Sequence, residues 1–354
     1  MSRPGDLTAA YDFDLPAELI AQRPAEQRDR SRLMVLARDR IEHRIFRDLP
    51  ELLQPADVLV LNRTRVIAAR LRGAREGSGG AVEVLVLHPV ESMRYDPSAT
   101  RWIALVRPGR RLRTGAVIRF SEHARARIVA ERDDGLRELE FALEEPFEDF
   151  LQRSGRMPLP PYIHNESDEA QARYQTVFAR EPGSVAAPTA SLHFTNEVLE
   201  GIGRSGTTVV ELTLDVGLGT FRPMSGVRLD DHTMHAERYV IEPAVCAAIE
   251  RAKAAGGRVI AAGTTVVRAL EGNVAAHGRL LAEEGTTALF IKPGFRFAVV
   301  DAMITNFHLP RSTLLVLVSA FAGRERVLAA YREAVARRYR FFSFGDAMFI
   351  ERGP

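Results

Sequence analysis

The amino-acid sequence predicts an α/β protein: a three-layer α/β/α sandwich around a mostly parallel sheet, with a small antiparallel β-barrel inserted into it. Strand-like and helix-like segments alternate after residue 206, as they do in parallel sheets with helical crossovers. From residue 66 to about 143, short β-type runs and glycine-rich turns follow one another without a helical period. We therefore predict a discontinuous α/β domain, residues 1–65 and 153–354, and a barrel domain, residues 66–152.

The N-terminal part of the α/β domain contains a hairpin and one buried strand. A short helix start is expected at 15–20, hairpin strands at 32–37 and 41–46, a helical turn at 48–53 and the buried strand at 57–61. Asn62, Arg63, Thr64 and Arg65 follow this strand directly. Polar residues in that position bind ligands in open α/β sheets, and a plain loop is the alternative interpretation.

The barrel domain is expected to consist of short strands joined by turns. The strands are expected at 66–71, 82–87, 102–106, 116–120, 127–130 and 136–141. Glycine-containing turns such as Gly77–Gly80 separate them. A helix at 147–153 and an extended, proline-rich connector at 157–162 lead back to the α/β domain.

The C-terminal part alternates helices and strands. Thr195 and Asn196 are good N-cap types and predict a helix that ends near Gly203 or Gly206. Further strands are expected at 207–214, 259–262 and 286–291, helices at 243–255, 264–275, 312–322 and 324–339, and a final extended segment at 341–350.

Composition narrows the class of protein. Apolar residues make up 46% and charged residues 27%, as in an ordinary globular chain. The single cysteine, Cys246, excludes an internal disulfide framework and a thiolate-rich metal site. Without a signal-peptide pattern or a membrane-length apolar run, the chain is expected to be cytoplasmic.

The net charge of +2 does not by itself indicate nucleic-acid binding. Arginines cluster within Arg101–Arg127 and Arg332–Arg340, and a solvated face is the default interpretation of each cluster.

The stretch from Ser184 to Asn196 combines a fixed turn, small residues and one imidazole. Pro188 fixes its own φ, and small residues such as Ser191 let another molecule approach the main chain. His193 follows beside that opening. The alternative is a loop whose histidine only forms a hydrogen bond with the backbone.

A second loop starts at Asp215 and is rich in glycine. Gly217 and Gly219 permit close approach of a ligand, Phe221 is suited to stacking on a base, and Arg222 is suited to a carboxylate or phosphate. The third glycine of a dinucleotide fingerprint is absent, so we expect no nicotinamide site. An ordinary tight turn is the alternative.

A third segment contains His232, His235 and Glu237. With His193 and His308, these residues raise the question of a metal site. The spacing matches no standard zinc signature and no cysteine contributes, so no metal is expected. General acid or base catalysis by these side chains, or hydrogen bonding without a catalytic role, is the favoured interpretation.

Two further segments follow strands and begin helices. At Gly263–Thr265, free backbone N–H groups and the positive end of a helix dipole are expected to face the crevice at the carboxyl ends of the strands, which suits an anion. Thr264 is also a good N-cap. Asp301, Asn306 and His308 place a carboxylate, an amide and an imidazole before another capped helix start.

With residues 157–164 and 338–348, these stretches resemble one family over nearly the whole chain, from Phe13 to Phe349: the S-adenosylmethionine:tRNA ribosyltransferase-isomerases of queuosine biosynthesis. The resemblance implies a three-layer α/β domain with an inserted β-barrel. It implies transfer and isomerisation of the ribosyl moiety of S-adenosylmethionine onto 7-aminomethyl-7-deazaguanine at the tRNA wobble position. Adenine and methionine leave, and the product is epoxyqueuosine. S-adenosylmethionine is then a co-substrate, and no metal or redox cofactor is implied.

The resemblance also gives expected site residues. His193 and His308 are the acid/base candidates because imidazole titrates near neutral pH, with Asp301 or Asp215 as orienting or cation-pairing group. The methionyl carboxylate is expected to bind at the helix start that follows Gly263 and to Arg268. Phe194 or Phe221 is expected to stack on adenine. The full donor set is Pro188, Thr189, Ser191, Phe194, Gly217, Gly219, Thr220, Phe221, Gly263, Thr264, Thr265 and Arg268. The acceptor set is Asn62, Thr64, Arg65, Arg222, His232, His235, Glu237, Asn306 and Arg340.

The expected partners are tRNA and S-adenosylmethionine, with no membrane, and the chain is expected to be a monomer. Two positions depart from the family pattern: Asp215, where a histidine is usual, and Arg63, where an acidic or amide residue is common. They support an alternative, a related ribosyl transferase with a non-tRNA acceptor. A non-catalytic RNA-binding module is the third reading, for which the clustered His, Asp and Gly loops would be superfluous.

Overall fold

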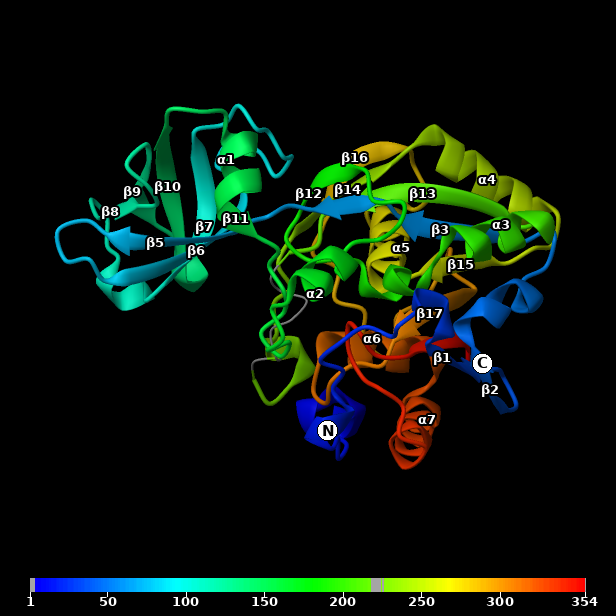
Figure 1. Ribbon diagram of the computed structural model, residues 1–354. Helices are drawn as coiled ribbons and strands as arrows, with labels where there is room; N and C mark the ends of the chain where they lie inside the picture. The colour runs from blue at the N-terminus through cyan, green and yellow to red at the C-terminus, as the bar shows by residue number, and fades with distance from the viewer. Residues whose placement is uncertain (1–3, 218–223, 225, 354) are drawn as a thin grey trace. The chain divides into compact units, whose positions relative to one another are not determined.

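The computed structural model describes residues 4–217, 224 and 226–353 (Figure 1). The chain forms two compact units: the first contains 1–63, 161–179 and 188–354, and the second 64–160 and 180–187. The sequence-based boundaries had assigned 153–160 and 180–187 to the α/β domain. The second unit includes 180–187 because β12 (Glu181–Ser184) pairs with β4 (Thr64–Val66) in a parallel ladder.

The first unit is built around one mixed sheet, which has nine strands in the described part of the chain. Their order is β16 (Glu283–Thr287), β14 (Glu237–Ile241), β13 (Thr208–Leu214), β3 (Val58–Asn62), β15 (Val259–Ala262), β17 (Ala302–Asn306), β18 (Ala347–Glu351), β1 (Arg32–Leu36) and β2 (Ile41–Ile45). The central strands β13, β3, β15 and β17 are parallel neighbours, and β18 pairs parallel with β1. The predicted α/β class is confirmed, and antiparallel pairings at both sides make the sheet mixed.

The central parallel strands are buried on both faces. β3, β15 and β17 are buried at every position, as expected of strands covered by helices on both faces. One face packs on the 3-10 helix η5 (Phe46–Leu52) and on α3 (Asn196–Arg204). Helices α4 (Pro243–Ala254) and α5 (Thr264–His277) contact the same strands from the other face (Figure 1). The result is three layers.

The remaining elements of the first unit complete its surface. The helices are α2 (Asp168–Arg173), α6 (Thr313–Ala322) and α7 (Arg324–Ala336), of which α6 packs against both α5 and α7. Short 3-10 helices are η1 (Pro4–Asp6), η2 (Thr8–Tyr11), η3 (Ala17–Leu19), η4 (Arg28–Arg30), η8 (Thr189–His193) and η10 (Leu229–Asp231). The N-cap prediction for α3 is confirmed, since the Thr195 side chain accepts a hydrogen bond from Val198 N.

The second unit is a closed antiparallel barrel. Its strands are β5 (Arg70–Arg75), β6 (Ala81–Pro89), β7 (Arg101–Arg107), β8 (Val117–Arg119), β9 (Ala124–Glu131) and β10 (Leu136–Leu143), with the short β11 (Gly155–Arg156) beside β5. Helix α1 (Phe147–Ser154) and the 3-10 helices η6 (Gly109–Arg111) and η7 (Asp133–Gly135) complete it. Pairing of β5 with β8 closes the barrel. Gly73 permits that closure, because a Cβ there would lie 2.8 Å from the carbonyl oxygen of Arg119.

Several predicted segments differ from the structure. The strand expected at 286–291 is β16 at Glu283–Thr287, and the helix expected to reach 339 ends at Ala336. The segments around His235 and Asn306, for which no strand was predicted, contain the strands β14 and β17. The strand expected at 66–71 is divided between β4 and β5. Helix α2 was not predicted.

Candidate functional site

The parallel strands β3, β15 and β17 are neighbours, so their carboxyl ends meet at one edge of the sheet. Asn62 ends β3, Gly263 follows β15 and Asn306 ends β17. The Asn62 amide donates to the carbonyl of Leu214 at 2.9 Å and approaches Thr265 Oγ1 at 3.5 Å. Sequence reasoning placed polar groups after these strands, and the structure brings those groups together.

The start of α5 is held in that edge by backbone geometry. Gly263 precedes α5 with φ of +106°, a conformation that residues with a side chain rarely adopt. Its N–H donates to the carbonyl of Ile304 at 2.8 Å. A Cβ at Gly263 would lie 3.7 Å from Ala190 Cβ, so the η8 loop passes close to this turn. Gly263, not Thr264 as expected, is the N-cap of α5.

His193 ends η8 and is buried, with hydrogen-bond partners at both ring nitrogens. Nδ1 lies 2.7 Å from Ser31 Oγ, and Nε2 lies 3.0 Å from Asn306 Nδ2. The Asn306 amide nitrogen also donates to the carbonyl of Phe342 at 3.2 Å. An amide nitrogen only donates, so Nε2 of His193 accepts and the ring proton is on Nδ1. Ser31 Oγ accepts that proton and donates its own to the Arg28 carbonyl at 3.1 Å.

The surroundings of His193 keep the ring neutral. Burial, together with the smaller effect of the positive charges of Arg340 and Arg28, lowers the pKa of His193 to about 3. The ring also packs on Phe46, with 5.2 Å between ring centroids. At physiological pH, His193 is therefore an unprotonated imidazole with one fixed tautomer.

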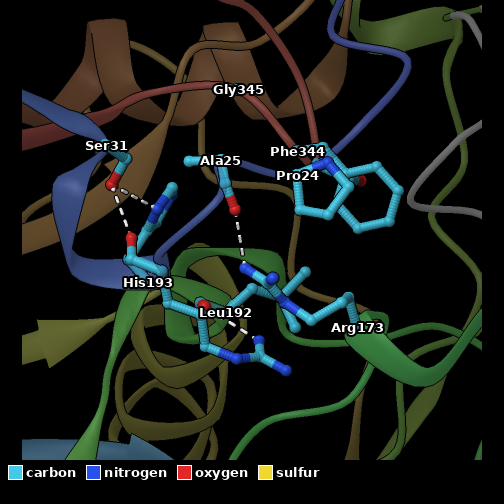
Figure 2. A pocket seen from close by; sticks show the side chains of 10 residues that line it. Pro24, Ala25, Ser31, Arg173, Leu192, His193, Phe344 and Gly345 are labelled. Atoms are coloured by element: carbon cyan, nitrogen blue, oxygen red, sulfur yellow. Dashed lines mark hydrogen bonds between the residues drawn. The ribbon is translucent and has the colours of Figure 1, made fainter. Parts of the chain in front are cut away.

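A small pocket lies beside His193 (Figure 2). Figure 2 shows the Ser31 side chain directed at the His193 ring, with Arg173 on the opposite side. Arg173 donates to the carbonyl of Ala25 at 2.8 Å, and Arg28 donates to that of Leu192 at 2.9 Å. The free volume of about 20 Å³ accommodates one water molecule, so a nucleoside does not fit in this pocket as it stands.

His308 follows the end of β17 and is also buried. Its Nε2 lies 2.8 Å from Thr305 Oγ1, and its backbone N–H donates to the Tyr331 hydroxyl at 3.0 Å. Burial lowers the pKa of His308 to about 3. Both predicted acid/base histidines are thus neutral and lie beside the carboxyl end of the same strand.

Two ion pairs lie beyond β13. Asp215 accepts from Arg238 Nη1 at 2.9 Å, and both side chains are buried. Glu237 pairs with Arg268 through Oε2 and accepts from Gly217 N through Oε1 at 3.0 Å. The predicted site residues Gly217 and Arg268 are thus both in direct contact with Glu237, and Asp215 pairs with Arg238. Nη2 of Arg268 is buried without a hydrogen-bond partner within residues 4–217, 224 and 226–353.

Two expected site residues lie elsewhere. Phe194 was expected to stack on adenine, but it is fully buried in the core under the sheet, with its ring 5.0 Å from that of Phe46. Asp301 precedes β17, so about 15 Å of strand separates it from the histidines. It instead accepts from Val259 N at 3.0 Å and lines a surface pocket with Arg352 and Glu351. We leave both residues out of the site.

The other expected residues are placed as follows. Pro188, Thr189 and Ser191 lie at η8, and Ser191 Oγ is fully buried without a partner among the described residues. Arg340 lies near enough to affect His193 and pairs with Asp346 at 3.7 Å. Thr64 and Arg65 belong to the second unit, where Arg65 lies 3.7 Å from Glu148.

The remaining expectations concern metals and undescribed positions. His232 and His235 precede β14, and burial lowers the pKa of His232. No cluster of three or more His, Cys, Asp or Glu side chains suited to a metal ion occurs among the described residues. Gly219, Thr220, Phe221 and Arg222 lie outside the residues that the structure describes. Within the described ranges, no helix combines the length and apolar character that crossing a bilayer requires.

Sequence reasoning missed Ser31 and Arg28. The only sequence signal for Ser31 is its position directly before the strand expected at 32–37. Its contact with His193 joins positions 162 residues apart, so no local pattern reveals it. Arg28 belongs to a segment to which no function was assigned.

Comparisons with known proteins give a consistent result. The chain matches the family model described as "Queuosine biosynthesis protein" over residues 8–350. It is 52% identical over 343 residues to the S-adenosylmethionine:tRNA ribosyltransferase-isomerase of Symbiobacterium thermophilum, covering 96% of this chain and 98% of that relative. It is also 52% identical over 344 residues to the protein of the same name from Moorella thermoacetica, with the same coverage. A crystal structure of S-adenosylmethionine tRNA ribosyltransferase from Thermotoga maritima is similar, with 39% identity, a TM-score of 0.55, and coverage of 96% of this chain and 99% of that one.

Proposed function

This chain belongs to the queuosine biosynthesis protein family, and we propose that it catalyses ribosyl transfer and isomerisation from S-adenosylmethionine to tRNA. The ribosyl moiety moves onto 7-aminomethyl-7-deazaguanine at the wobble position. Adenine and methionine leave, and epoxyqueuosine-tRNA forms. The observation that carries this assignment is the 52% identity to a ribosyltransferase-isomerase over 96% of the chain.

The reaction requires a proton acceptor near the sugar. The sulfonium of S-adenosylmethionine acidifies the adjacent C5′ proton, adenine departs with proton assistance, and the amine attacks the sugar. We assign proton acceptance to His193, whose Nε2 carries a lone pair because Ser31 holds the proton on Nδ1. Asn306 then occupies the position that the reacting proton takes, and its amide must turn or shift when the donor binds. His308 remains the second acid/base candidate.

The start of α5 is the proposed site for the methionyl carboxylate. Backbone N–H groups and the positive end of the helix dipole point into the edge where β3, β15 and β17 end. Thr265 lies on that turn next to Asn62. Arg268, one turn further, has one guanidinium nitrogen without a partner in the described part of the chain. These groups together suit a carboxylate.

The two departures from the family pattern form local ion pairs. Arg63 donates to Glu242 at 2.5 Å and to Thr213 Oγ1 at 3.3 Å. Asp215 is paired with Arg238 at 2.9 Å. Because nearby residues of opposite charge compensate both, neither departure requires a different acceptor, and we keep tRNA as the substrate.

The proposal extends to the setting of the reaction. The chain acts as a monomer in the cytoplasm, where tRNA is its acceptor. S-adenosylmethionine serves as a co-substrate, and no metal or redox cofactor enters the proposal. The wobble base lies in a single-stranded loop, so it reaches the crevice without the opening of a duplex.

Release of adenine tests this function. The protein is mixed with S-adenosylmethionine and either tRNA carrying the modified base, the same tRNA without it, or the free base. Adenine appearing only with the modified tRNA is the expected result. Adenine with the free base alone would favour the small-molecule transferase, and no adenine in any mixture would favour a binding module.

A further inference from the structure

The barrel carries arginines that the proposed reaction does not use. Along β8 and β9, buried and exposed positions alternate: Ile118 and Ala126 face the barrel interior, whereas Arg119, Arg125 and Arg127 are exposed. The period of two places all three arginines on the outer surface. A basic surface is therefore built into the strands themselves, not into a mobile loop.

The register places two of these arginines directly opposite each other. Arg119 on β8 is the partner of Arg125 on β9. Like charges facing each other on neighbouring strands repel and destabilise the sheet. Small side chains adjoin the pair, since Ala74 of β5 lies opposite Arg119 and Ala142 of β10 lies opposite Arg125. Neither neighbour neutralises the charge.

Carboxylates neutralise several other arginines of the barrel but not this pair. Arg113 lies 2.9 Å from Glu131, Arg127 lies 2.7 Å from Glu140, and Arg132 lies 2.7 Å from Glu138. Arg101 and Arg153 also pair with glutamates. The ion pairs of the described part of the chain, such as these five, include neither Arg119 nor Arg125. Two unneutralised guanidinium groups thus lie side by side where an anion would relieve their repulsion.

A surface hollow of about 460 Å³ adjoins Arg125. Its charged lining residues are Arg125, Arg127, Glu76 and Glu140, of which Arg127 and Glu140 pair with each other. Strands β8, β9 and β10, which form its floor, lie side by side in Figure 1. The guanidinium group presents a planar fork of donors that matches phosphate oxygens. An open surface that carries two unneutralised arginines suits a polyanion with repeated phosphates better than a small ligand that needs enclosure.

We propose that the outer face of β8 and β9, with Arg119 and Arg125 at its centre, binds the sugar–phosphate backbone of tRNA. The inference rests on the proposed function for the identity of the nucleic acid. Binding there is independent of base sequence, because phosphate contacts set position and not specificity. It adds affinity to the recognition of the wobble base.

The test compares Arg119→Gln/Arg125→Gln with the control Arg153→Gln. Arg153 on α1 is exposed in the same unit, but it pairs with Glu145, which lies in the turn before that helix. Each protein is assayed for binding of an unmodified tRNA transcript between about 50 and 200 mM salt. The KM for modified tRNA is measured by adenine release, and thermal unfolding checks the fold.

The expected result for the double variant is a Kd and KM for tRNA raised about tenfold, and a log–log salt slope smaller by about two, one per phosphate contact. The control should keep wild-type binding. Unchanged affinity and slope in the double variant would overturn the inference, and so would an equal loss in the control. If the wild-type protein binds tRNA through Arg119 and Arg125 but releases no adenine, the proposed reaction is wrong, whereas the proposed tRNA-binding surface is retained.

Discussion

At His193, burial and two hydrogen bonds determine which protons the ring carries. A pKa lowered to about 3 leaves the imidazole neutral, with a single ring proton, throughout the pH range in which enzymes work. The Asn306 amide donates a hydrogen bond to the lone pair of Nε2, and Ser31 Oγ accepts one from the proton on Nδ1. Neutrality suits a proton acceptor next to a sulfonium, since a cationic ring there would be repelled by the substrate.

Replacing His193 with alanine tests proton transfer. We expect kcat for adenine release to fall by ~100-fold or more, because a positioned acid or base contributes about that much. The measurement is single-turnover adenine release at saturating donor and tRNA. An unchanged rate in a folded variant would remove His193 from the chemistry.

Ser31 tests whether the tautomer matters. In Ser31→Ala, the Nδ1 proton loses its acceptor, and leaving a buried donor unpaired costs about 1–3 kcal/mol. We expect kcat to fall by roughly tenfold or more, with the KM for S-adenosylmethionine little changed. Ser31→Thr keeps the hydroxyl and should recover most of the rate. Equal losses in both variants would indicate a packing role instead.

His308 provides a test of stability against pH. Its pKa is about 3 in the folded protein and 6.5 in a model peptide, so the unfolded chain binds a proton that the folded chain does not. Its contribution is complete above pH 6.5 and is lost as pH falls toward 3. At pH 5 the loss is about 2 kcal/mol.

The comparison is between wild type and His308→Gln, by urea unfolding at pH 7 and pH 5 with far-UV circular dichroism. The variant should lose about 2 kcal/mol less than wild type between the two pH values. The same loss in both proteins would mean that the histidine protonates while the protein stays folded.

At the level of elements, the sequence predicted the apolar strands well and the charged ones poorly. β3 and β15 are short apolar runs, and both were predicted within one residue of their bounds. β14 was missed because it begins with Glu237 and Arg238, which read as a polar loop. Both are buried only because Arg268 and Asp215, distant in the chain, neutralise them. Such compensation is a property of the folded structure.

Phe194 shows the same limit at the site. An aromatic residue next to a histidine suits a stacking role and a core role equally in sequence, and here it packs beneath the sheet with Val198 and Ile202 of α3. We expect Phe194→Ala to lower the free energy of unfolding by about 3–5 kcal/mol through the cavity it leaves. Chemical denaturation measures this.

Val227, of which 73% is exposed, provides the control, since Val227→Ala should change stability by less than about 0.5 kcal/mol. A Phe194→Ala variant with wild-type stability and a raised KM for S-adenosylmethionine would restore the stacking role.

At the scale of the whole molecule, fold class and the presence of a barrel could be predicted from the alternation of patterns alone. The division of the chain could be predicted only in part, because the return of residues 180–187 to the second unit depends on the pairing of β12 with β4. Of the site, His193 and Asn306 were expected and are joined by a hydrogen bond. Ser31 was not expected, because its contact is long-range.

The two units offer separate spectroscopic reporters. Trp102, the single tryptophan, is buried in the barrel and stacks on Phe147 with 4.5 Å between ring centroids. Its fluorescence therefore reports unfolding of the second unit. Helices α2–α7 belong to the first unit and dominate the far-UV circular dichroism signal. Each unit can thus be followed during one thermal scan.

If the donor binds at the carboxyl ends of β3, β15 and β17, it stabilises the first unit selectively. At about 100 times its Kd, a ligand adds ~2.7 kcal/mol to the state that binds it. We expect S-adenosylmethionine to raise the midpoint of the circular dichroism transition and to leave that of Trp102 fluorescence in place. Equal shifts of both midpoints would mean that the donor site takes residues from both units. The described crevice, all of whose proposed donor groups lie in the first unit, would then be incomplete.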